Sequence, residues 1–233
     1  MQAVSAQQVQ WARHITSEGF DECLDLTSDA SGNVYATGQI EFIANFDGLL
    51  LESAGVHDIF VAKYDSSGNL LWAKRAGGIG GDKGQSIAVD GSGNVFIVGE
   101  IDDTSYFDTI QVVPRDKNNL FVAKFNSIGE AQWVRHIESD SLNTRGYGIA
   151  CDDQGNVYAC GAMQYNAYYD GNLILTSNGE YDGILLKFDS NGNFKWIKQI
   201  GGSGIDKANG IALKGKDLYV TGRFERAEAR RHV

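Results

Sequence analysis

Five copies of a short acidic phrase, Asp-x-x-Gly-Asn, are the residues in this 233-residue chain whose types and spacing best suit a chemical role. The copies begin at Asp29, Asp65, Asp90, Asp152 and Asp189, and they end at Asn33, Asn69, Asn94, Asn156 and Asn193. Carboxylate and amide oxygens are ligands that Ca²⁺ prefers. The same residue types also close β-hairpins, because Asp accepts bonds from nearby amides and Gly tolerates positive φ. The phrase therefore predicts either an ion site or a turn.

The composition of each copy favours the turn. A calcium site needs about six to eight oxygen ligands with several carboxylates, and each copy usually offers a single Asp. We therefore predict structural turns at all of these Asp and Asn positions, with no metal site and no cofactor. A calcium-stabilised adhesion module stays open as an alternative function.

Catalytic chemistry finds less support than binding. The histidines are His14, His57, His136 and His232, and two of them occupy matching places, in "WARHI" and "WVRHI". A catalytic group normally occurs once, not as an optional variant of a recurring phrase. The sequence has no Gly-x-Ser-x-Gly, His-Glu-x-x-His or phosphate-binding motif. We predict that the chain is not an enzyme, with a glycan hydrolase or lyase that uses a central acidic pocket as the alternative.

The elements that carry these residues recur with a unit of about 61 positions. Tryptophans stand at Trp11, Trp72, Trp133 and Trp196, which are 61, 61 and 63 positions apart. Two further series keep nearly the same spacing, namely Tyr35, Phe96, Tyr158, Tyr219 and Gly38, Gly99, Gly161, Gly222. Agreement among independent series indicates a tandem array of one structural unit.

Each unit divides into four strand-like segments, here named a, b, c and d. In the second unit they are "QSIAVD" (85–90), "NVFIVGEI" (94–101), "LFVAKFN" (120–126) and "AQWVRHI" (131–137). All are short, rich in β-branched and aromatic residues, and bounded by Gly, Asn, Asp or Ser, which is typical of strands. No segment has a sustained helical period. The chain is therefore predicted to be all-β.

Four antiparallel strands repeating at this interval predict the blades of a β-propeller. The strand-d tryptophans and strand-b aromatics would pack between blades. We expect Lys63, Lys124 and Lys187, in "VAK" and "LLK", to pair with acidic neighbours. Asp21, Asp82 and Asp206, which recur before strand a, are interpreted as carboxylates that stabilise the connection.

Two strings make this prediction more specific. "GGIGGDKGQSIAVDGSGNVFIVGEI" and "DIFVAKYDSSGNLLWAKRAGG" resemble the SBBP-type β-propeller repeats of bacteria and archaea, and the resemblance runs from about Gln10 to Gly222. It implies a propeller in a secreted or cell-surface protein, and it carries no catalytic residue across. The spacing Asp-x-x-Gly-x-x-x-Trp also resembles the Asp-box of sialidase propellers, which is a structural hairpin there.

The array leads to a division of the chain into three parts. Residues 1–8 are predicted to be the remnant of a signal peptide, because "AVSA" has the small-x-small form of a cleavage site. Residues 9–222 form the repeat array, with units at about 17–76, 77–137 and 138–200 and a partial unit at 201–222. It starts with a lone strand d at 9–15 and ends after a and b, so about three and a half blades and an incomplete propeller are predicted. Residues 223–233 form an atypical basic tail.

The order of the turns predicts two different faces. Turns a–b and c–d share one face, and the longer b–c segments 41–57, 102–119 and 164–181 reach the other. The b–c segments contain an aromatic–Asp pair, Phe46-Asp47, Phe107-Asp108 and Tyr169-Asp170, followed by an extra strand-like run. Because binding surfaces are often loops on a rigid scaffold, the candidate binding residues on this face are Asp102, Asp103, Asp140, Tyr165 and Tyr168. The aromatic–Asp pairs are better explained as anchors of the extra strand.

Composition limits the partners. The formal net charge of −10 argues against nucleic acid, and no apolar run reaches the roughly 20 residues that insertion as a membrane-spanning helix requires. We predict a non-catalytic scaffold, secreted or at the cell surface, that binds protein or carbohydrate. The three cysteines, Cys23, Cys151 and Cys160, are expected to be buried free thiols. The oligomeric state is left open.

Overall fold

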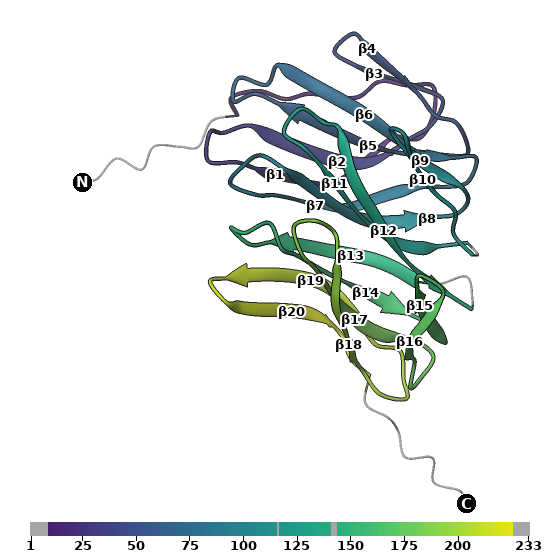
Figure 1. Ribbon diagram of the computed structural model, residues 1–233. Coiled ribbons are helices and arrows are strands. Elements are labelled where there is room, and N and C mark those ends of the chain that lie inside the picture. The colour runs from purple at the N-terminus through teal and green to yellow at the C-terminus, as the bar shows by residue number, and fades with distance from the viewer. Residues whose placement is uncertain (1–8, 116, 141–143, 226–233) are drawn as a thin grey trace, which may run out of the picture.

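All regular elements of the computed structural model are β-strands among the residues that it describes, which are 9–115, 117–140 and 144–225 (Figure 1). The predicted signal-peptide remnant at 1–8 lies outside these ranges, as does the predicted basic tail beyond residue 225. No helix within the described ranges is long and apolar enough to cross a membrane.

The first blade is an antiparallel sheet in which four strands follow the order β1-β2-β5-β6. These strands are β1 (Glu22–Ser28), β2 (Val34–Ile40), β5 (Asp58–Tyr64) and β6 (Leu70–Gly78), and they correspond to the predicted strands a to d. One Asp-x-x-Gly-Asn turn joins β1 to β2 and another joins β5 to β6. The segment between β2 and β5 forms a hairpin of its own, β3 (Ile43–Phe46) and β4 (Leu49–Glu52).

The second and third blades repeat this order. The second blade consists of β7 (Lys83–Val89), β8 (Val95–Ile101), β11 (Asn119–Phe125) and β12 (Ala131–Ser139), with β9 (Ser105–Phe107) and β10 (Ile110–Val112) between β8 and β11. The third consists of β13 (Thr144–Cys151), β14 (Val157–Met163), β17 (Asp182–Phe188) and β18 (Phe194–Ile200), with β15 (Asn166–Tyr169) and β16 (Asn172–Thr176) between β14 and β17. The last sheet holds β19 (Lys207–Lys214) and β20 (Asp217–Arg223). The strands of the second blade lie within two residues of the predicted bounds.

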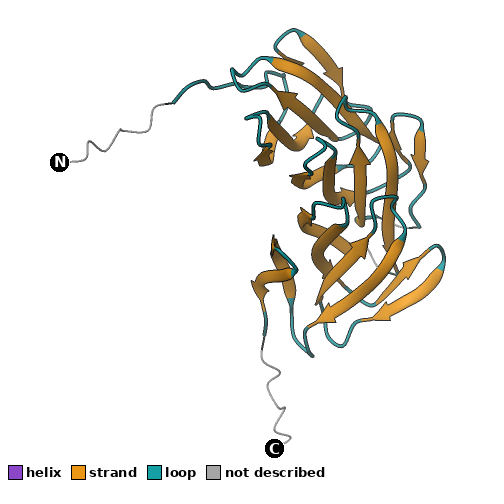
Figure 2. Ribbon diagram, turned by 60° about the vertical axis from the view of Figure 1, so that its left-hand side comes forward, coloured by secondary structure: helices purple, strands orange, loops and turns teal. Residues whose placement is uncertain are grey.

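The blades pack face to face in a curved stack (Figure 2). The first strands of successive sheets, β1, β7, β13 and β19, lie beside one another. Tyr35 and Ile59 of the first blade belong to one buried cluster with Ile87 and Ile97 of the second. The core therefore lies between blades, as the aromatic spacing predicts. Within the part of the chain that the structure describes, the stack does not close into a ring.

The outer hairpins connect neighbouring blades. β9 pairs with the end of β6 in the preceding blade, and β15 pairs with β12 in the same way. β3 makes the corresponding contact through Asn45, which forms an isolated bridge with Thr16. The extra strand predicted after each aromatic–Asp pair is present as β4, β10 and β16. The second and third blades are thus each bonded to the blade before them at the outer edge, and the first blade is bonded to the segment at Thr16.

The lone strand d predicted at 9–15 is not a strand. Trp11 nevertheless takes the place of a strand-d tryptophan, because its ring packs on Gly68 and its Nε1 donates to the carbonyl of Ser66 at 3.2 Å. A segment becomes a strand through ladder bonds to a neighbour, and the described residues include no strand c beside this segment. The side chain is therefore in register while the backbone lacks a pairing partner.

Candidate functional site

The Asp-x-x-Gly-Asn copies form tight turns whose carboxylates serve the turn itself. In each copy Asp Oδ1 accepts the amides two and four residues on, and Oδ2 accepts the Asn side chain at 2.7–2.9 Å. The Gly has φ between 73° and 81° in all five copies, which glycine adopts without strain. The bond from the Asn69 side chain, with those from the turn amides, holds the pKa of Asp65 below its ordinary value. These oxygens are occupied by donors, and no group of three or more His, Cys, Asp or Glu in the described ranges could hold a metal ion.

The c–d turns also receive the tryptophan of the preceding blade. Trp72 packs on Gly129, where a Cβ would come within 2.9 Å of the ring, and its Nε1 donates to Ser127 O at 3.2 Å. Trp11 and Trp133 make the same contacts with Gly68 and Ser66 and with Gly192 and Ser190. The turn therefore needs glycine for two reasons: the backbone has a positive φ, and a Cβ would collide with the tryptophan ring. This explains why even the variant turn "NSIGE" at 126–130 keeps its Gly.

Turns a–b and c–d of one blade lie side by side. A Cβ on Gly32 would be 3.2 Å from Ser66, and the equivalent distances are 3.3 Å from Gly93 to Ser127 and 3.2 Å from Gly155 to Ser190. The short turns thus share one face, and the outer hairpins belong to the longer b–c segments.

The recurring lysines have aromatic partners in place of the predicted acidic ones. The Nζ atoms of Lys63, Lys124 and Lys187 lie 5.0, 5.6 and 4.7 Å from the ring centroids of Tyr35, Phe96 and Tyr158. Strand c lies directly beside strand b, and each lysine is opposite the strand-b aromatic in the register. The prediction of acidic partners was wrong because the neighbour across the ladder is a ring, and a cation over a ring face is favourable.

The aromatic–Asp pairs form the turns of the outer hairpins. Asp47, Asp108 and Asp170 have φ of 50°, 52° and 49°, values that Asp tolerates better than most residues. Phe46 and Phe107 before them are buried, with relative exposures of 1% and 0%. The pairs are therefore structural anchors, in agreement with the preferred interpretation of the sequence.

A polar cluster lies on the outer edge of the second blade, where β15 pairs with β12. The guanidinium of Arg115 stacks on the ring of Tyr168 at 4.6 Å. Its nitrogens lie 3.4 Å from Glu138 Oε2 and 3.9 Å from Asp140 Oδ1. Asp140 Oδ2 accepts the Tyr168 hydroxyl at 2.8 Å and the Asn166 amide at 2.7 Å. The bonds from Asn166 and Tyr168 hold the pKa of Asp140 below its ordinary value. We call these five residues the Arg115 cluster.

Only two of the five predicted binding residues meet in this cluster. Asp140 and Tyr168 are bonded to each other, whereas Asp102 and Asp103 lie in the β8–β9 connection. Asp102 is half-buried and accepts the amide of Asn118, and Asp103 accepts the amide of Thr104. Tyr165 has φ of 61° at the base of the third outer hairpin, where its amide donates to the Ser177 hydroxyl and its carbonyl accepts the Ser177 amide. The sequence analysis missed Arg115, Glu138 and Asn166, because none of them belongs to a recurring pattern.

Two buried carboxylates meet at the junction of the first and second blades. Asp58 begins β5, Asp82 lies in the connection from β6 to β7, and both residues are 0% exposed. A Cβ on Gly77 would lie 2.7 Å from Asp58 Oδ1 and 2.7 Å from Asp82 Oδ2, so these oxygens converge over one glycine. Asp58 Oδ1 has no hydrogen-bond partner among the described residues. Asp82 is thus a connection carboxylate, and its partner on strand c was missed.

Burial raises the pKa of Asp82 to about 6, and the charge of Asp58 adds to this shift. Hydrogen bonds from the amides of Asp102 and Gly78 act in the opposite direction. Burial also raises the pKa of Asp58, although its Oδ2 receives a bond from Arg75. We predict that a proton shared by the two carboxyl groups supplies the donor that Asp58 Oδ1 lacks. The pair is therefore suited to a structural role and is closed to any substrate.

The other two blade junctions can be compared at the three positions that Asp58, Asp82 and Gly77 occupy in the first junction. The third junction holds Asp182, Asp206 and Gly201, and the second holds Asn119, Thr144 and Glu138. At the third junction the two carboxylate oxygens again converge over glycine, at 2.6 and 2.7 Å from its Cβ position. At the second junction both acids are replaced by neutral residues, and the glycine position bears a side chain, Glu138.

These features define an all-β architecture of repeated four-stranded blades, which is consistent with a β-propeller. Residues 71–107 match the family described as SBBP, a beta-propeller repeat. This match confirms, for the segment that it covers, the resemblance to SBBP-type β-propeller repeats seen in the sequence.

Two distant relatives come from very different sources. The chain is 22% identical over 201 residues to the "Uncharacterized WD repeat-containing protein L264" of Acanthamoeba polyphaga mimivirus, which covers 73% of this chain and 14% of that protein. It is 24% identical over 177 residues to the "Regulatory protein FlaEY" of Caulobacter vibrioides, covering 71% of this chain and 18% of that protein. The chain thus spans less than a fifth of either relative.

Proposed function

We propose that this chain is a non-catalytic extracellular scaffold whose outer-hairpin face binds a protein or a glycan. The extracellular location rests on the resemblance to SBBP-type repeats. The last sheet has two described strands where the other blades have four, which supports an incomplete array of about three and a half blades. A binding module of this kind would form one part of a larger propeller.

One observation carries the proposal, namely the Arg115 cluster. A half-buried aromatic ring with a stacked guanidinium and two carboxylates can contact a partner through apolar, cationic and acidic groups at once. Tyr and Arg are also enriched among the residues that dominate binding energy at interfaces. The cluster sits where a hairpin of the third blade pairs with the second, so its backbone is held by two blades.

The carboxylates best placed for acid–base chemistry support a non-catalytic role. Asp58, Asp82, Asp182 and Asp206 are buried, at 0% to 1% exposure, so a glycan has no access to them. A glycosidase needs two carboxyl groups on either side of its scissile bond. In this chain the acidic pairs lie inside the blade junctions.

Binding is tested with labelled protein on a glycan array and on an array of surface proteins from the source organism. Tyr168→Ala should weaken any specific signal at least tenfold. Tyr106→Ala is the matched control, because Tyr106 holds the same register position on β9, is 46% exposed, and has no Arg115 cluster around it. Equal loss in both variants, or no loss in either, would reject this surface. Fractionation of the source organism tests the location, and a cytoplasmic protein would reject the extracellular part.

A further inference from the structure

The outer strand of the second blade is paired only in part on one of its sides. β12 is bonded to β11 along its length, but on its other side β15 pairs with it only at Glu138 and Ser139. At the opposite end the Ala131 amide donates to the Asp108 carboxylate of the β9–β10 turn at 2.7 Å. Between these two ends no other described strand pairs with this side of β12. The open stretch, 132–137, is about 20 Å long at the usual rise of a strand.

Two residues of this stretch turn their backbone groups to the open side. Along a strand these groups point alternately to the two sides. The Asp140 amide donates to the carbonyl of Asn166, on the side of β15, and the register of β12 is regular from Val134 to its end. Val134 and His136 therefore face the same side as Asp140. A row of unpaired backbone groups at a sheet edge is a template for a further strand.

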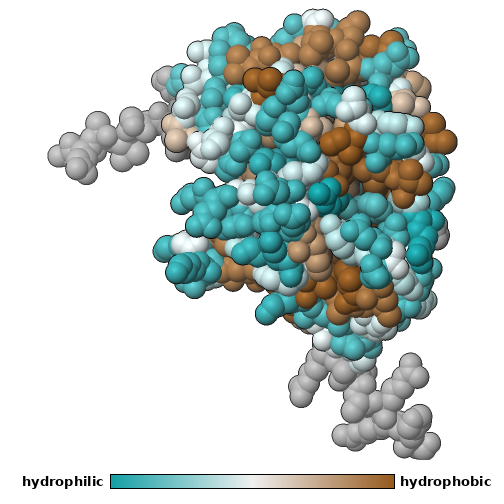
Figure 3. Space-filling view, in the orientation of Figure 1, coloured by the Kyte–Doolittle hydropathy of each residue, from teal (hydrophilic) through white to brown (hydrophobic). Residues whose placement is uncertain are grey.

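A groove of about 670 Å³ lies beside this edge. One wall is the outer hairpin of the second blade, and the other is the hairpin turn of the third blade with the start of β18. The apolar residues that line it are Ile110, Val112, Val113, Val134, Tyr169 and Phe194. A second hollow of about 400 Å³ shares Ile110, Val134 and Arg135 with it. Hydrophobic side chains gather at the right of Figure 3, where Figure 1 places β9 and β10. Both walls belong to blades with all four strands, so the groove is fully formed.

Arg135 lines this groove without a carboxylate partner among the described residues. Its half-buried guanidinium donates from Nε to Gly192 O at 2.7 Å and from a terminal nitrogen to Val134 O at 2.8 Å. Every other arginine in the described ranges has an acidic partner, namely Arg13, Arg75, Arg115, Arg145 and Arg223. In a chain with a net charge of −10, an arginine without an acid is an exception. A guanidinium has five N–H donors, so Arg135 can bind a carboxylate and keep both bonds.

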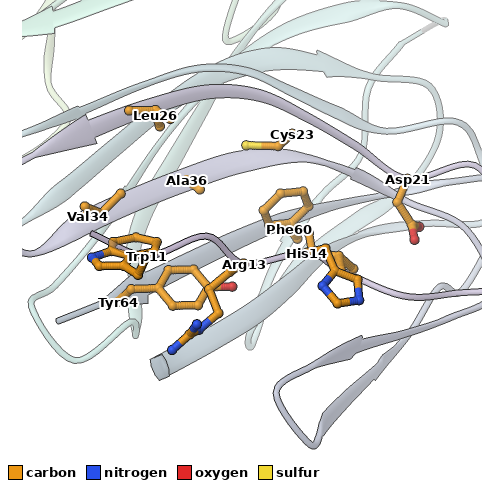
Figure 4. A pocket seen from close by; sticks show the side chains of 11 residues that line it. Trp11, Arg13, His14, Asp21, Cys23, Leu26, Val34, Ala36, Phe60 and Tyr64 are labelled. Atoms are coloured by element: carbon orange, nitrogen blue, oxygen red, sulfur yellow. The ribbon is translucent and has the colours of Figure 1, made fainter. Parts of the chain in front are cut away.

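The matching arginine of the repeat has such a carboxylate. Arg13 also stands two residues after a recurring tryptophan (Figure 4), and its Nε lies 3.2 Å from Asp47 Oδ2, in the turn of the first outer hairpin. The counterpart of Asp47 in the third hairpin, Asp170, lines the groove but forms no ion pair with Arg135. The place beside Arg135 is therefore open to a carboxylate from another molecule.

We propose that an extended acidic segment of a partner protein binds in this groove as an added strand on β12. Its backbone would pair with Val134 and His136, and its side chains would alternate between the two walls. A Glu or Asp on the side of the third blade would meet Arg135, and β-branched residues on the other side would pack on Ile110 and Val113.

This inference rests on the proposed function and narrows its partner to a protein, since a glycan offers no alternating row of amides and carbonyls. The groove adjoins the Arg115 cluster, because His136 Nε2 lies 3.0 Å from Glu138 Oε1 and Val113 precedes Arg115 by two residues. A partner that contacts the cluster could thus extend a segment into the groove.

The charge requirement is tested on an array of heptapeptides, blocked at both ends, in which the central residue is Glu, Gln or Lys and the others vary. The best Glu peptides should bind at least tenfold more tightly than their Gln and Lys counterparts. Arg135→Gln should remove this preference, and Lys74→Gln, at the same position of the first blade, should leave it unchanged. Arg135→Lys should retain it in weaker form and should fold, because Lys74 and Lys198 occupy this position in neighbouring blades. Asp170→Asn should strengthen binding severalfold, because it removes the negative charge in the groove.

N-methylated peptides distinguish an added strand from simple attraction of charges. Methyl groups on one alternate set of amides of the best Glu peptide should weaken binding at least tenfold, and methyl groups on the other set should have little effect. Hydrogen exchange at the amides of Val134 and His136 should slow when the unmethylated peptide is added.

Equal binding of Glu and Gln peptides would overturn the inference, as would equal losses in Arg135→Gln and Lys74→Gln. The same holds if both methylated sets bind alike. A protein or glycan that requires Tyr168 but is unaffected by Arg135→Gln would leave the proposed function standing and refute the groove alone.

Discussion

Asp58→Asn tests the shared proton at the first blade junction. The amide nitrogen of Asn would take the place of Asp58 Oδ1 and donate to Asp82, while its oxygen keeps the bonds from Arg75 and the Ala54 amide. Asn119 already occupies this position in the second blade, so the fold accommodates the residue. The variant thus replaces a titratable donor with a permanent one.

The magnitude follows from the pKa of Asp82, which rises from 3.8 to about 6 on folding. This difference of about 2 units is equivalent to about 3 kcal/mol. Because the folded chain binds this proton more tightly than the unfolded chain, the contribution is fully present below about pH 4. The free energy of unfolding then falls as the pH rises through about 6. The turn carboxylates act in the opposite sense, since the pKa of Asp65 is lowered and its stabilising effect is lost only as the pH falls below 3.8.

The assay is urea or thermal unfolding of both proteins between pH 4.5 and pH 8. The wild-type chain should lose about 2 kcal/mol over this interval, because part of the total is already lost at pH 4.5. Asp58→Asn should lose less, because the charge of Asp58 is gone and the Asn amide donates to ionised Asp82, although burial of Asp82 remains. At about 2–4 °C per kcal/mol for a chain of this size, the two melting curves should diverge by a few degrees toward high pH.

A control variant isolates the pair. Asn119→Asp introduces a buried carboxyl group at the second junction and should add a pH dependence of the same sign. Parallel pH profiles for the wild-type chain and Asp58→Asn would refute the shared proton. A melting temperature that depends on Ca²⁺ or EDTA in the wild-type chain alone would indicate a cation between the carboxylates instead.

Three further outcomes test the repeating contacts. Asp29→Ala should lower the free energy of unfolding by about 2 kcal/mol, because it leaves turn amides and the Tyr35 hydroxyl without an acceptor. Asp90→Ala should lower it by about half as much in the same urea titration, because Phe96, which holds the position of Tyr35, has no hydroxyl. Trp72→Phe should cost about 1 kcal/mol through the lost bond to the next blade, and Trp196→Phe should cost less, since the described residues provide no turn for it to meet. EDTA should leave the melting temperature unchanged, because the turn carboxylates are already bonded; a drop would support the calcium alternative.

The sequence predicts the blades well because each blade imposes the same demands on its neighbours. Trp72 recurs at a fixed interval because it must cover the Gly129 turn of the next blade, and Tyr35 recurs because it fills the adjacent core. These requirements are local to one unit or to successive units, so they leave a period in the sequence. The strands and turns follow from that period, and so does the sharing of the core between blades.

The candidate site is harder to predict because it depends on contacts that do not repeat. Arg115 reaches Tyr168 across 53 positions of the chain, from a loop of one unit to a hairpin of the next. The partner of Asp82 on strand c is found only when the fold places both carboxylates against Gly77. Cys23 was expected to be buried and is exposed, because the face that its strand presents has no covering blade among the described residues.

The variation between junctions explains why the Arg115 cluster occurs in one blade. Glu138, a member of that cluster, occupies the position of Gly77 and Gly201. At those two junctions a side chain would collide with a pair of converging carboxylates, at 2.6–2.7 Å from its Cβ. Only where Asn119 and Thr144 replace the acids can this position carry a carboxylate to the outer edge. A junction can therefore hold either a buried pair of carboxylates over a glycine or an acidic side chain at the glycine position. The junction after the second blade has the acidic side chain, Glu138.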